Sequence, residues 1–265
     1  MNPQNASEPG GADIQARIAK IDPPSRRSSH VSSTRTWRDG SRTARRWDTE
    51  LLAWAALCVG GGAIASILLR TLIPTTAGSL MSALAMWAGM AAPVVLAFRR
   101  SRPRGLLRFR WVDVLYAIVL GGALRIIQGW FAVAAGDSGA FPTYPLVDGR
   151  LPDLWWLTSL VGPVAIAPLL EEFLFRGVVL VAVFRLARRG LDGGALALVA
   201  STAAFVALHA ISGMASWAEP VSLTFVGLTC ALLVLLTGRI WGAVLTHVVF
   251  NASAVGLALI GTMLA

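Results

Sequence analysis

The stretch that decides the fold runs from Leu154 to Ala187 and reads LWWLTSLVGPVAIAPLLEEFLFRGVVLVAVFRLA. It is apolar almost throughout, but its centre holds two adjacent glutamates, Glu171 and Glu172, followed by Arg176. A carboxylate at the centre of a bilayer-spanning helix costs roughly 2.5–3.5 kcal/mol on insertion scales. Because charged residues inside spanning segments mark functional sites by default, we take the two glutamates as the starting point for function.

The whole chain has the composition of a membrane protein. Of its 265 residues 55% are hydrophobic and 14% are charged, and the mean hydropathy is +0.65. Soluble domains have about 25% charged residues. Several other apolar stretches are long enough to cross a bilayer as helices, and they lack the alternation of barrel strands. We therefore predict an all-α, polytopic transmembrane helical bundle with about seven or eight membrane helices.

The apolar stretches also predict where the helices lie. Ordinary spans are expected at about 51–69, 80–98, 112–135, 195–211, 221–237 and 243–264. The run Gly60-Gly61-Gly62 in the first span predicts a close helix approach. The stretch 154–187 is too long for one ordinary span, and Pro163 and Pro168 interrupt its first half. We predict a short or re-entrant helix there, followed by a glutamate-bearing helix that begins near Leu169.

Composition and charge divide the chain into three parts. Residues 1–48 are rich in Ser, Arg, Pro and Gly and predict a disordered, basic cytoplasmic tail. Residues 49–153 hold the N-terminal transmembrane helices, and 154–265 hold the polar core. The net charge of +9 comes from arginines that cluster between apolar segments, most densely over 99–110. Such loops lie in the cytoplasm by the positive-inside rule, so the partner of this charge is the lipid bilayer and not nucleic acid.

Few strongly polar side chains remain inside the predicted spans. The main ones are Glu171, Glu172, Arg176, His209, His247 and Asn251. Glu172 and Arg176 are four residues apart, so they share a helix face and can form an ion pair. Glu171 is turned about 100° from Glu172, which leaves it free to face a cavity. His247 and Asn251 are also four residues apart and share a face.

These side chains suit hydrolysis of an amide bond. A carboxylate in a partly desolvated cavity can act as a general base, and a histidine beside it can orient or polarise a water molecule. A second histidine and an amide can donate hydrogen bonds to a developing oxyanion. Glu171, His209 and His247 are alternatively candidate ligands of Zn²⁺. The motif His-Glu-x-x-His of soluble zinc proteases is absent from the sequence.

Three motifs in this order resemble those of the CPBP family of intramembrane proteases: Glu171-Glu172-x-x-x-Arg176, Phe205-x-x-x-His209 and His247-x-x-x-Asn251. That family comprises CAAX prenyl proteases and bacteriocin-processing or immunity-linked membrane proteins. The resemblance covers about residues 154–256. It implies that Glu171 is the general base, that His209 helps to activate water, and that His247 and Asn251 hold the oxyanion. Glu172, Arg176 and Phe205 would shape the site. The family is commonly labelled as metalloproteases, so zinc is a possible cofactor.

We therefore expect an intramembrane endopeptidase that cleaves a membrane-associated, CAAX-type or bacteriocin-like substrate by glutamate-activated water. The expected setting is a bacterial plasma membrane with the N-terminus in the cytoplasm. Two alternatives stay open at this point. One is a non-catalytic protein for bacteriocin immunity or scaffolding, in which the polar cluster joins helices. The other is a transporter, which buried Glu and His residues also serve, although no inverted repeat is visible between the halves.

Overall fold

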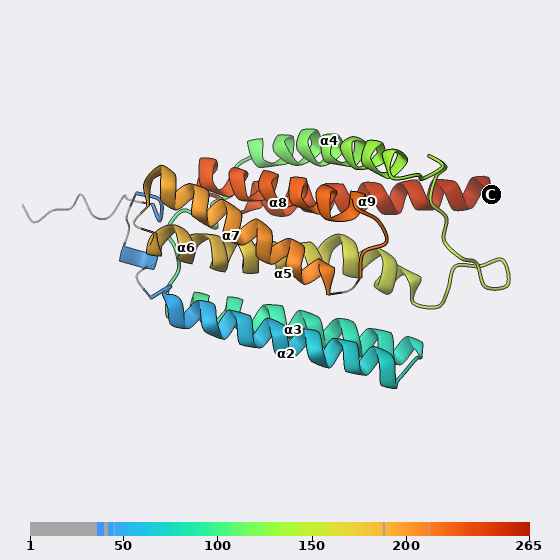
Figure 1. Ribbon diagram of the computed structural model, residues 1–265, viewed down its shortest axis with the longest axis horizontal. Helices are drawn as coiled ribbons and strands as arrows, with labels where there is room; N and C mark the ends of the chain where they lie inside the picture. The colour runs from blue at the N-terminus through green and yellow to red at the C-terminus, as the bar shows by residue number, and fades with distance from the viewer. Residues whose placement is uncertain (1–35, 40–41, 45, 188, 212) are drawn as a thin grey trace, which may run out of the picture. The chain divides into compact units, whose positions relative to one another are not determined.

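The described part of the chain is helical, and it confirms the all-α polytopic prediction (Figure 1). The computed structural model describes residues 36–39, 42–44, 46–187, 189–211 and 213–265. Six of its helices are long and apolar enough to cross a membrane. They are α2 (Thr49–Leu72), α3 (Thr76–Arg100), α4 (Val112–Ala134), α7 (Gly190–Ala210), α8 (Ala218–Thr237) and α9 (Trp241–Leu264).

The stretch that carries the glutamates is helical without a break, which corrects one prediction. It consists of η3 (Trp156–Ile166), α5 (Ala167–Glu172), η4 (Phe173–Val179) and α6 (Leu180–Leu186). No separate helix begins near Leu169. The segments η3 and η4 are π-helical, and Pro163 lies inside η3. A π-helical turn bonds each N–H to the fifth residue back, and this change of register accommodates the donor that proline lacks.

The helices α2 and α3 form an antiparallel pair through small residues. A Cβ atom added at Gly62 would lie 3.0 Å from the carbonyl oxygen of Ala85 and 3.0 Å from the Cα of Gly89. The hydroxyls of Ser66 and Ser82 are 2.7 Å apart across the same interface. Gly62 therefore makes the predicted close approach. Gly61 does not contribute, because a Cβ there would meet no atom within 4 Å.

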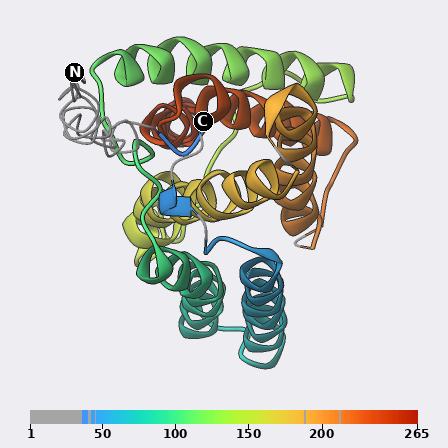
Figure 2. The ribbon, with the colours of Figure 1, turned by 90° about the vertical axis from the view of Figure 1, so that its left-hand side faces the viewer.

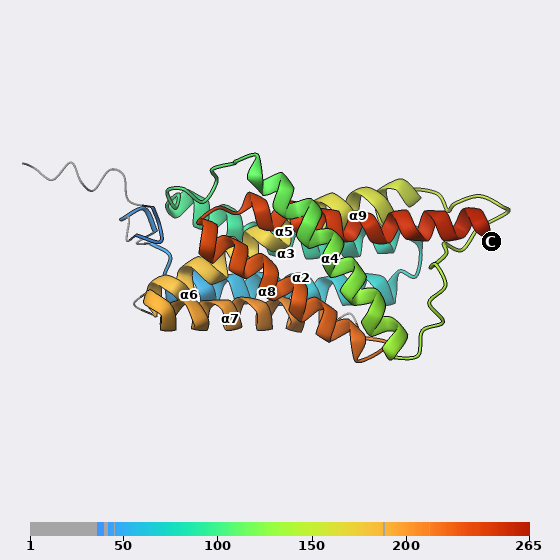
Figure 3. The same ribbon diagram turned by 90° about the horizontal axis from the view of Figure 1, so that it is seen from above.

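The glutamate-bearing stretch lies at the centre of the helices. Seen end-on in Figure 2, it runs between the α2–α3 pair on one side and the layer of α4, α8 and α9 on the other. The helix α7 packs against α6, η4 and α8. Figure 3 shows α4 crossing over α8 and α9, with which it packs. Because helices surround this stretch on several sides, its polar side chains are shielded from the lipid.

The segment just before α2 packs onto the helix ends, which corrects the end of the predicted disordered tail. The indole of Trp37 donates a 2.9 Å hydrogen bond to the carbonyl of Gly238, and that of Trp47 donates a 3.1 Å hydrogen bond to Ala97. Both rings are buried. Burial of a large apolar ring together with a satisfied N–H explains why these residues are ordered. The rest of the tail prediction, residues 1–35, 40–41 and 45, lies outside the described residues.

Candidate active site

The two adjacent glutamates lie at the end of α5, and both are buried. Glu172 is fully buried and Glu171 is 9% exposed. Successive residues of a helix are rotated by about 100°, so the two carboxylates point in different directions. Each meets a different set of partners. The two partner sets decide what the site can do.

Glu172, in α5, is held in a buried network that joins five helical elements. Its Oε1 atom lies 3.0 Å from Nη1 of Arg176 in η4 and 2.9 Å from Nδ1 of His247 in α9. Arg176 also donates a 3.2 Å hydrogen bond to the carbonyl of Gly227 in α8, and its guanidinium lies 4.5 Å from the ring centre of Phe205 in α7. Buried charges persist in proteins when they are paired in this way.

Glu171 faces the two histidines. Its Oε2 atom is 3.9 Å from Nε2 of His209 and 3.9 Å from Nε2 of His247. Both distances are too long for a direct hydrogen bond, and a polar separation of this size suits a bridging water. One carboxylate oxygen therefore faces two imidazole nitrogens at the same distance.

The Nδ1 atom of each imidazole makes a hydrogen bond away from Glu171, and these bonds orient both rings. Nδ1 of His209 lies 3.0 Å from the carbonyl oxygen of Phe205. A carbonyl oxygen only accepts, so this Nδ1 carries the proton and donates it. Nδ1 of His247 likewise donates to the carboxylate of Glu172. Both Nε2 atoms are consequently left to face Glu171.

Phe205 packs against the polar groups of the site. Its ring is fully buried, with ring centres 4.5 Å from His209 and 5.7 Å from His247. On its other side it meets the ring of Phe175 edge-on, at 5.6 Å. Aromatic contacts of this kind hold rings in fixed relative positions. The predicted site-shaping residue Phe205 thus contacts both histidines directly.

Asn251 is a predicted site residue whose side-chain hydrogen bond goes to the backbone and not to another site residue. Its side-chain amide donates a 2.8 Å hydrogen bond to the carbonyl of Pro163 in η3. Asn251 lies one helical turn beyond His247 on α9, so both share a face. An amide nitrogen has two N–H donors, which leaves one after the bond to Pro163.

Sequence reasoning missed two connections of the site. It did not pair Glu172 with His247, because these residues are 75 positions apart and no local spacing signals the contact. It also missed the carbonyl of Pro163 as an acceptor. The available signal was Pro168: in the π-helical register the N–H of residue 168 would bond to the carbonyl of Pro163, and proline has no N–H, so that carbonyl is free for a side-chain donor.

The side chains do not have the spacing of a zinc site. Zinc ligands lie at ~2.0–2.1 Å from the metal, so tetrahedral ligand atoms are roughly 3.3 Å apart. The carboxylate oxygen of Glu171 is 3.9 Å from each imidazole nitrogen. Within the ranges that the structure describes, no three or more His, Cys, Asp or Glu side chains are grouped to hold a metal ion. As they stand, these residues do not fit the metal, and the chemistry below is derived from the side chains alone.

Two other charged residues, both in α4, connect that helix to its neighbours. Asp113, which is fully buried, pairs with Arg239 through a 2.6 Å contact between Oδ1 and Nη2. Arg125 donates 2.6 Å and 3.1 Å hydrogen bonds to the carbonyl of Phe250 and the hydroxyl of Ser253 in α9, and it also contacts Gln128. Arg125 therefore pairs within the protein.

Comparison with protein families gives one match. Residues 153–253 match the family described as type II CAAX prenyl endopeptidase, Rce1-like. Curated proteins and solved structures give no match. The matched segment contains all three polar motifs and excludes α2, α3 and α4. The chain is therefore an integral membrane protein whose segment 153–253 is similar to the Rce1-like type II CAAX prenyl endopeptidases, as the three motifs predicted.

Proposed function

We propose that this protein is an intramembrane endopeptidase in which Glu171 activates a water molecule to hydrolyse a peptide bond of a membrane-associated substrate. The observation that carries the proposal is the position of Glu171 Oε2, 3.9 Å from Nε2 of both His209 and His247. Both rings are held in place through their Nδ1 atoms. A base, a water-orienting group and a donor to the oxyanion then meet around one small volume.

In the first step a water molecule lies between Glu171 and His209. The water gives one hydrogen bond to the carboxylate and one to Nε2 of His209, which accepts because its proton is on Nδ1. Glu171 takes a proton as the water oxygen attacks the carbonyl carbon of the substrate. The π electrons of that carbonyl move to its oxygen, and a tetrahedral intermediate with one negative charge forms.

In the second step His247 and Asn251 stabilise the oxyanion. Both donate an N–H: His247 as the imidazolium, and Asn251 through the amide hydrogen that Pro163 does not use. Before the water attacks, both carboxylates are ionised, so Glu171, Glu172 and Arg176 together carry one net negative charge, which a second proton on His247 cancels. Glu172 accepts from Nδ1 of that ring and supports its charge.

In the third step the intermediate collapses. The carbon–nitrogen bond breaks, and Glu171 returns its proton to the leaving amine. The products are a carboxylic acid and an amine, and the base is restored. No residue forms a covalent bond with the substrate, so no acyl-enzyme accumulates. CAAX-type or bacteriocin-like peptides are the substrate classes to test first.

The test is cleavage of a panel of membrane-anchored and prenylated peptides by purified protein. Replacing Glu171 with Gln keeps the shape of the side chain but removes the base. We expect kcat to fall by about 10²–10⁴, the usual contribution of general acid–base catalysis. The matched control is Glu50→Gln, at an exposed carboxylate outside the site. Undiminished cleavage by Glu171→Gln contradicts the mechanism and favours the alternative of a non-catalytic or scaffolding membrane protein.

The same assay tests zinc as a possible cofactor. No step above needs a metal, so a chelator such as EDTA should leave the cleavage rate unchanged. Metal analysis of the purified protein gives an independent measurement. Stoichiometric zinc, together with loss of activity on chelation and its recovery on adding zinc back, would replace the water-activation step with a metal-dependent one.

A further inference from the structure

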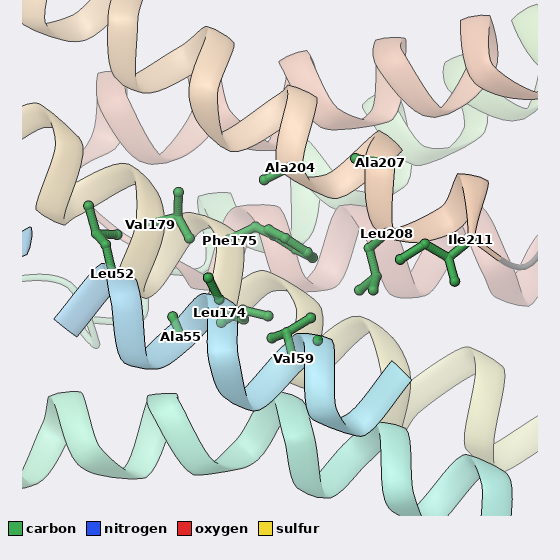
Figure 4. A pocket seen from close by; sticks show the side chains of 12 residues that line it. Leu52, Ala55, Val59, Leu174, Phe175, Val179, Ala204, Ala207, Leu208 and Ile211 are labelled. Carbon is green, nitrogen blue, oxygen red and sulfur yellow. The ribbon is translucent and has the colours of Figure 1, made fainter. Parts of the chain in front are cut away.

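A second feature near the site is an apolar groove between α2, η4 and α7. Figure 4 shows side chains from all three elements pointing into it, among them Val59 of α2, Leu174 and Phe175 of η4, and Leu208 of α7, with Ile211 directly after α7. Its volume is about 380 Å³. All twelve of its lining residues are apolar or glycine. Desolvating a charged or polar ligand here would be costly, so the groove suits a hydrocarbon group.

The groove adjoins the candidate active site through lining residues that contact or directly precede site residues. Phe175 lines the groove and packs against Phe205, whose ring contacts both histidines. Leu208, another lining residue, directly precedes His209. Consecutive Cα atoms of a peptide are ~3.8 Å apart, so a residue next to the scissile bond can extend its side chain into a neighbouring groove. The groove is therefore placed to hold a side chain of the same peptide that the site would cleave.

One wall of the groove contains a glycine that no helix contact requires. Gly60 lines the groove, and a Cβ atom added there would meet nothing within 4 Å. This differs from Gly62, two residues on, which is needed for the approach of α3. Glycine weakens a helix interior relative to alanine. The absence of a side chain at Gly60 therefore leaves open space in the groove.

We propose that α2 supplies one wall of the substrate-binding site and that Gly60 sets the size of the aliphatic group that the groove accepts. The occupant is an aliphatic side chain of the peptide substrate, close to its scissile bond. The inference rests on the proposed endopeptidase function and extends it. Because α2 lies outside the matched segment 153–253, this specificity wall is a feature of the chain beyond that segment.

The first experiment compares two variants of neighbouring glycines. Gly60→Leu fills the groove, whereas Gly61→Leu adds the same side chain where a Cβ also meets nothing within 4 Å and does not line the groove. The substrates are two anchored peptides that carry Leu or Ala beside the scissile bond. We expect the ratio of kcat/KM for Leu over Ala to fall by about 10–200-fold in Gly60→Leu, mainly through KM. Gly61→Leu should keep the wild-type ratio.

The second experiment measures binding without turnover. An anchored peptide with a diazirine-bearing leucine is cross-linked to Glu171→Gln protein, and the labelled residues are mapped by mass spectrometry. We expect labels on Val59 and Leu208, lost when Gly60→Leu is added and kept when Gly61→Leu is added. A diazirine phospholipid serves as the competing probe. The proposal is overturned if the phospholipid labels these residues and the peptide does not displace it, or if Gly60→Leu leaves the peptide labels in place.

The two experiments separate failure of the groove from failure of the catalytic proposal. If the peptide labels the groove but wild-type protein cleaves nothing, the endopeptidase proposal fails and the groove assignment stands. If wild-type protein cleaves and Gly60→Leu has the selectivity of Gly61→Leu, the groove assignment is wrong and the endopeptidase proposal stands. Thermal unfolding of both leucine variants in detergent checks that each is folded.

Discussion

At the scale of single residues, two neighbouring carboxylates have different partners because one step along a helix turns a side chain by about 100°. Glu172 meets Arg176 and His247 at 3.0 Å and 2.9 Å and is fully buried. Oε2 of Glu171 lies 3.9 Å from Nε2 of both imidazoles, too far for a direct hydrogen bond. A tightly paired carboxylate is suited to position a histidine, and one that stands off its partners has room for a water molecule between them.

This contrast predicts a stability effect at Glu172. Glu172→Gln leaves Arg176 buried without its counter-charge, which should cost about 3–5 kcal/mol of unfolding free energy. Glu50→Gln breaks a partly exposed pair with Arg100 and should cost at most about 1 kcal/mol. Chemical unfolding in detergent micelles measures both. Equal stability of the two variants would contradict the paired, buried state of Glu172.

The double variant Glu172→Gln, Arg176→Met separates stability from activity. Replacing both charges removes the unpaired cation, so stability should return toward the wild-type value. Cleavage should stay impaired, because His247 still lacks the carboxylate that supports its charge. Recovery of full activity in the double variant would show that Glu172 acts on the fold alone.

At the scale of elements, small residues decide how closely helices approach. Gly62 and Gly89 bring α2 and α3 together, and α2 makes its most extensive packing with α3. A neighbouring face of α2 borders the groove next to the site. The close approach within this pair therefore governs where the groove wall stands.

Adding a side chain at this contact should force the pair apart. Gly62→Leu places a Cβ atom 3.0 Å from backbone atoms of α3, where neither can move far. We expect a loss of about 1–3 kcal/mol from overpacking. Gly61→Leu serves as the control, since its Cβ meets nothing within 4 Å. Thermal unfolding in detergent tests the difference, and a Gly62→Leu protein as stable as Gly61→Leu would contradict it.

At the scale of the whole described chain, the arginine-bearing connections converge on one end of the helices. The backbone N–H of Ile240, between α8 and α9, donates a hydrogen bond to the carbonyl of Leu106, between α3 and α4. The side chain of Arg185 donates a hydrogen bond to the carbonyl of Trp47, just before α2. Arg239 reaches Asp113 at the start of α4. The positive-inside rule predicts that this end faces the cytoplasm and that the 135–153 connection faces the opposite side.

Cysteine labelling tests this orientation. Arg102→Cys and Ser138→Cys place an exposed thiol in the 101–111 and 135–153 connections. A membrane-impermeant maleimide should label Ser138→Cys in intact cells and Arg102→Cys only after permeabilisation. The wild-type protein is the blank, because Cys58 and Cys230 lie within α2 and α8. The reverse labelling pattern would invert the proposed topology.

The amino-acid sequence by itself determined the membrane class, the order of the spans and the short list of polar residues. These follow from local rules: an apolar run must satisfy its own backbone bonds as a helix, and residues four apart share a face. The site was visible at this level as Glu172 with Arg176, and as His247 with Asn251. The break predicted near Leu169 failed because local rules treat a proline as a stop, whereas π-helical turns carry the chain through Pro163.

Only the tertiary structure decided how these pieces meet. Three features of the site depend on contacts between different helices. They are the hydrogen bond between Glu172 and His247, the equal distances from Glu171 to the two imidazoles, and the hydrogen bond from Asn251 to the carbonyl of Pro163. The groove beside Gly60 likewise exists only where α2, η4 and α7 come together. Spacing along one helix follows from about 3.6 residues per turn, but the rotation and depth of a helix against its neighbours depend on how side chains far apart in the chain pack.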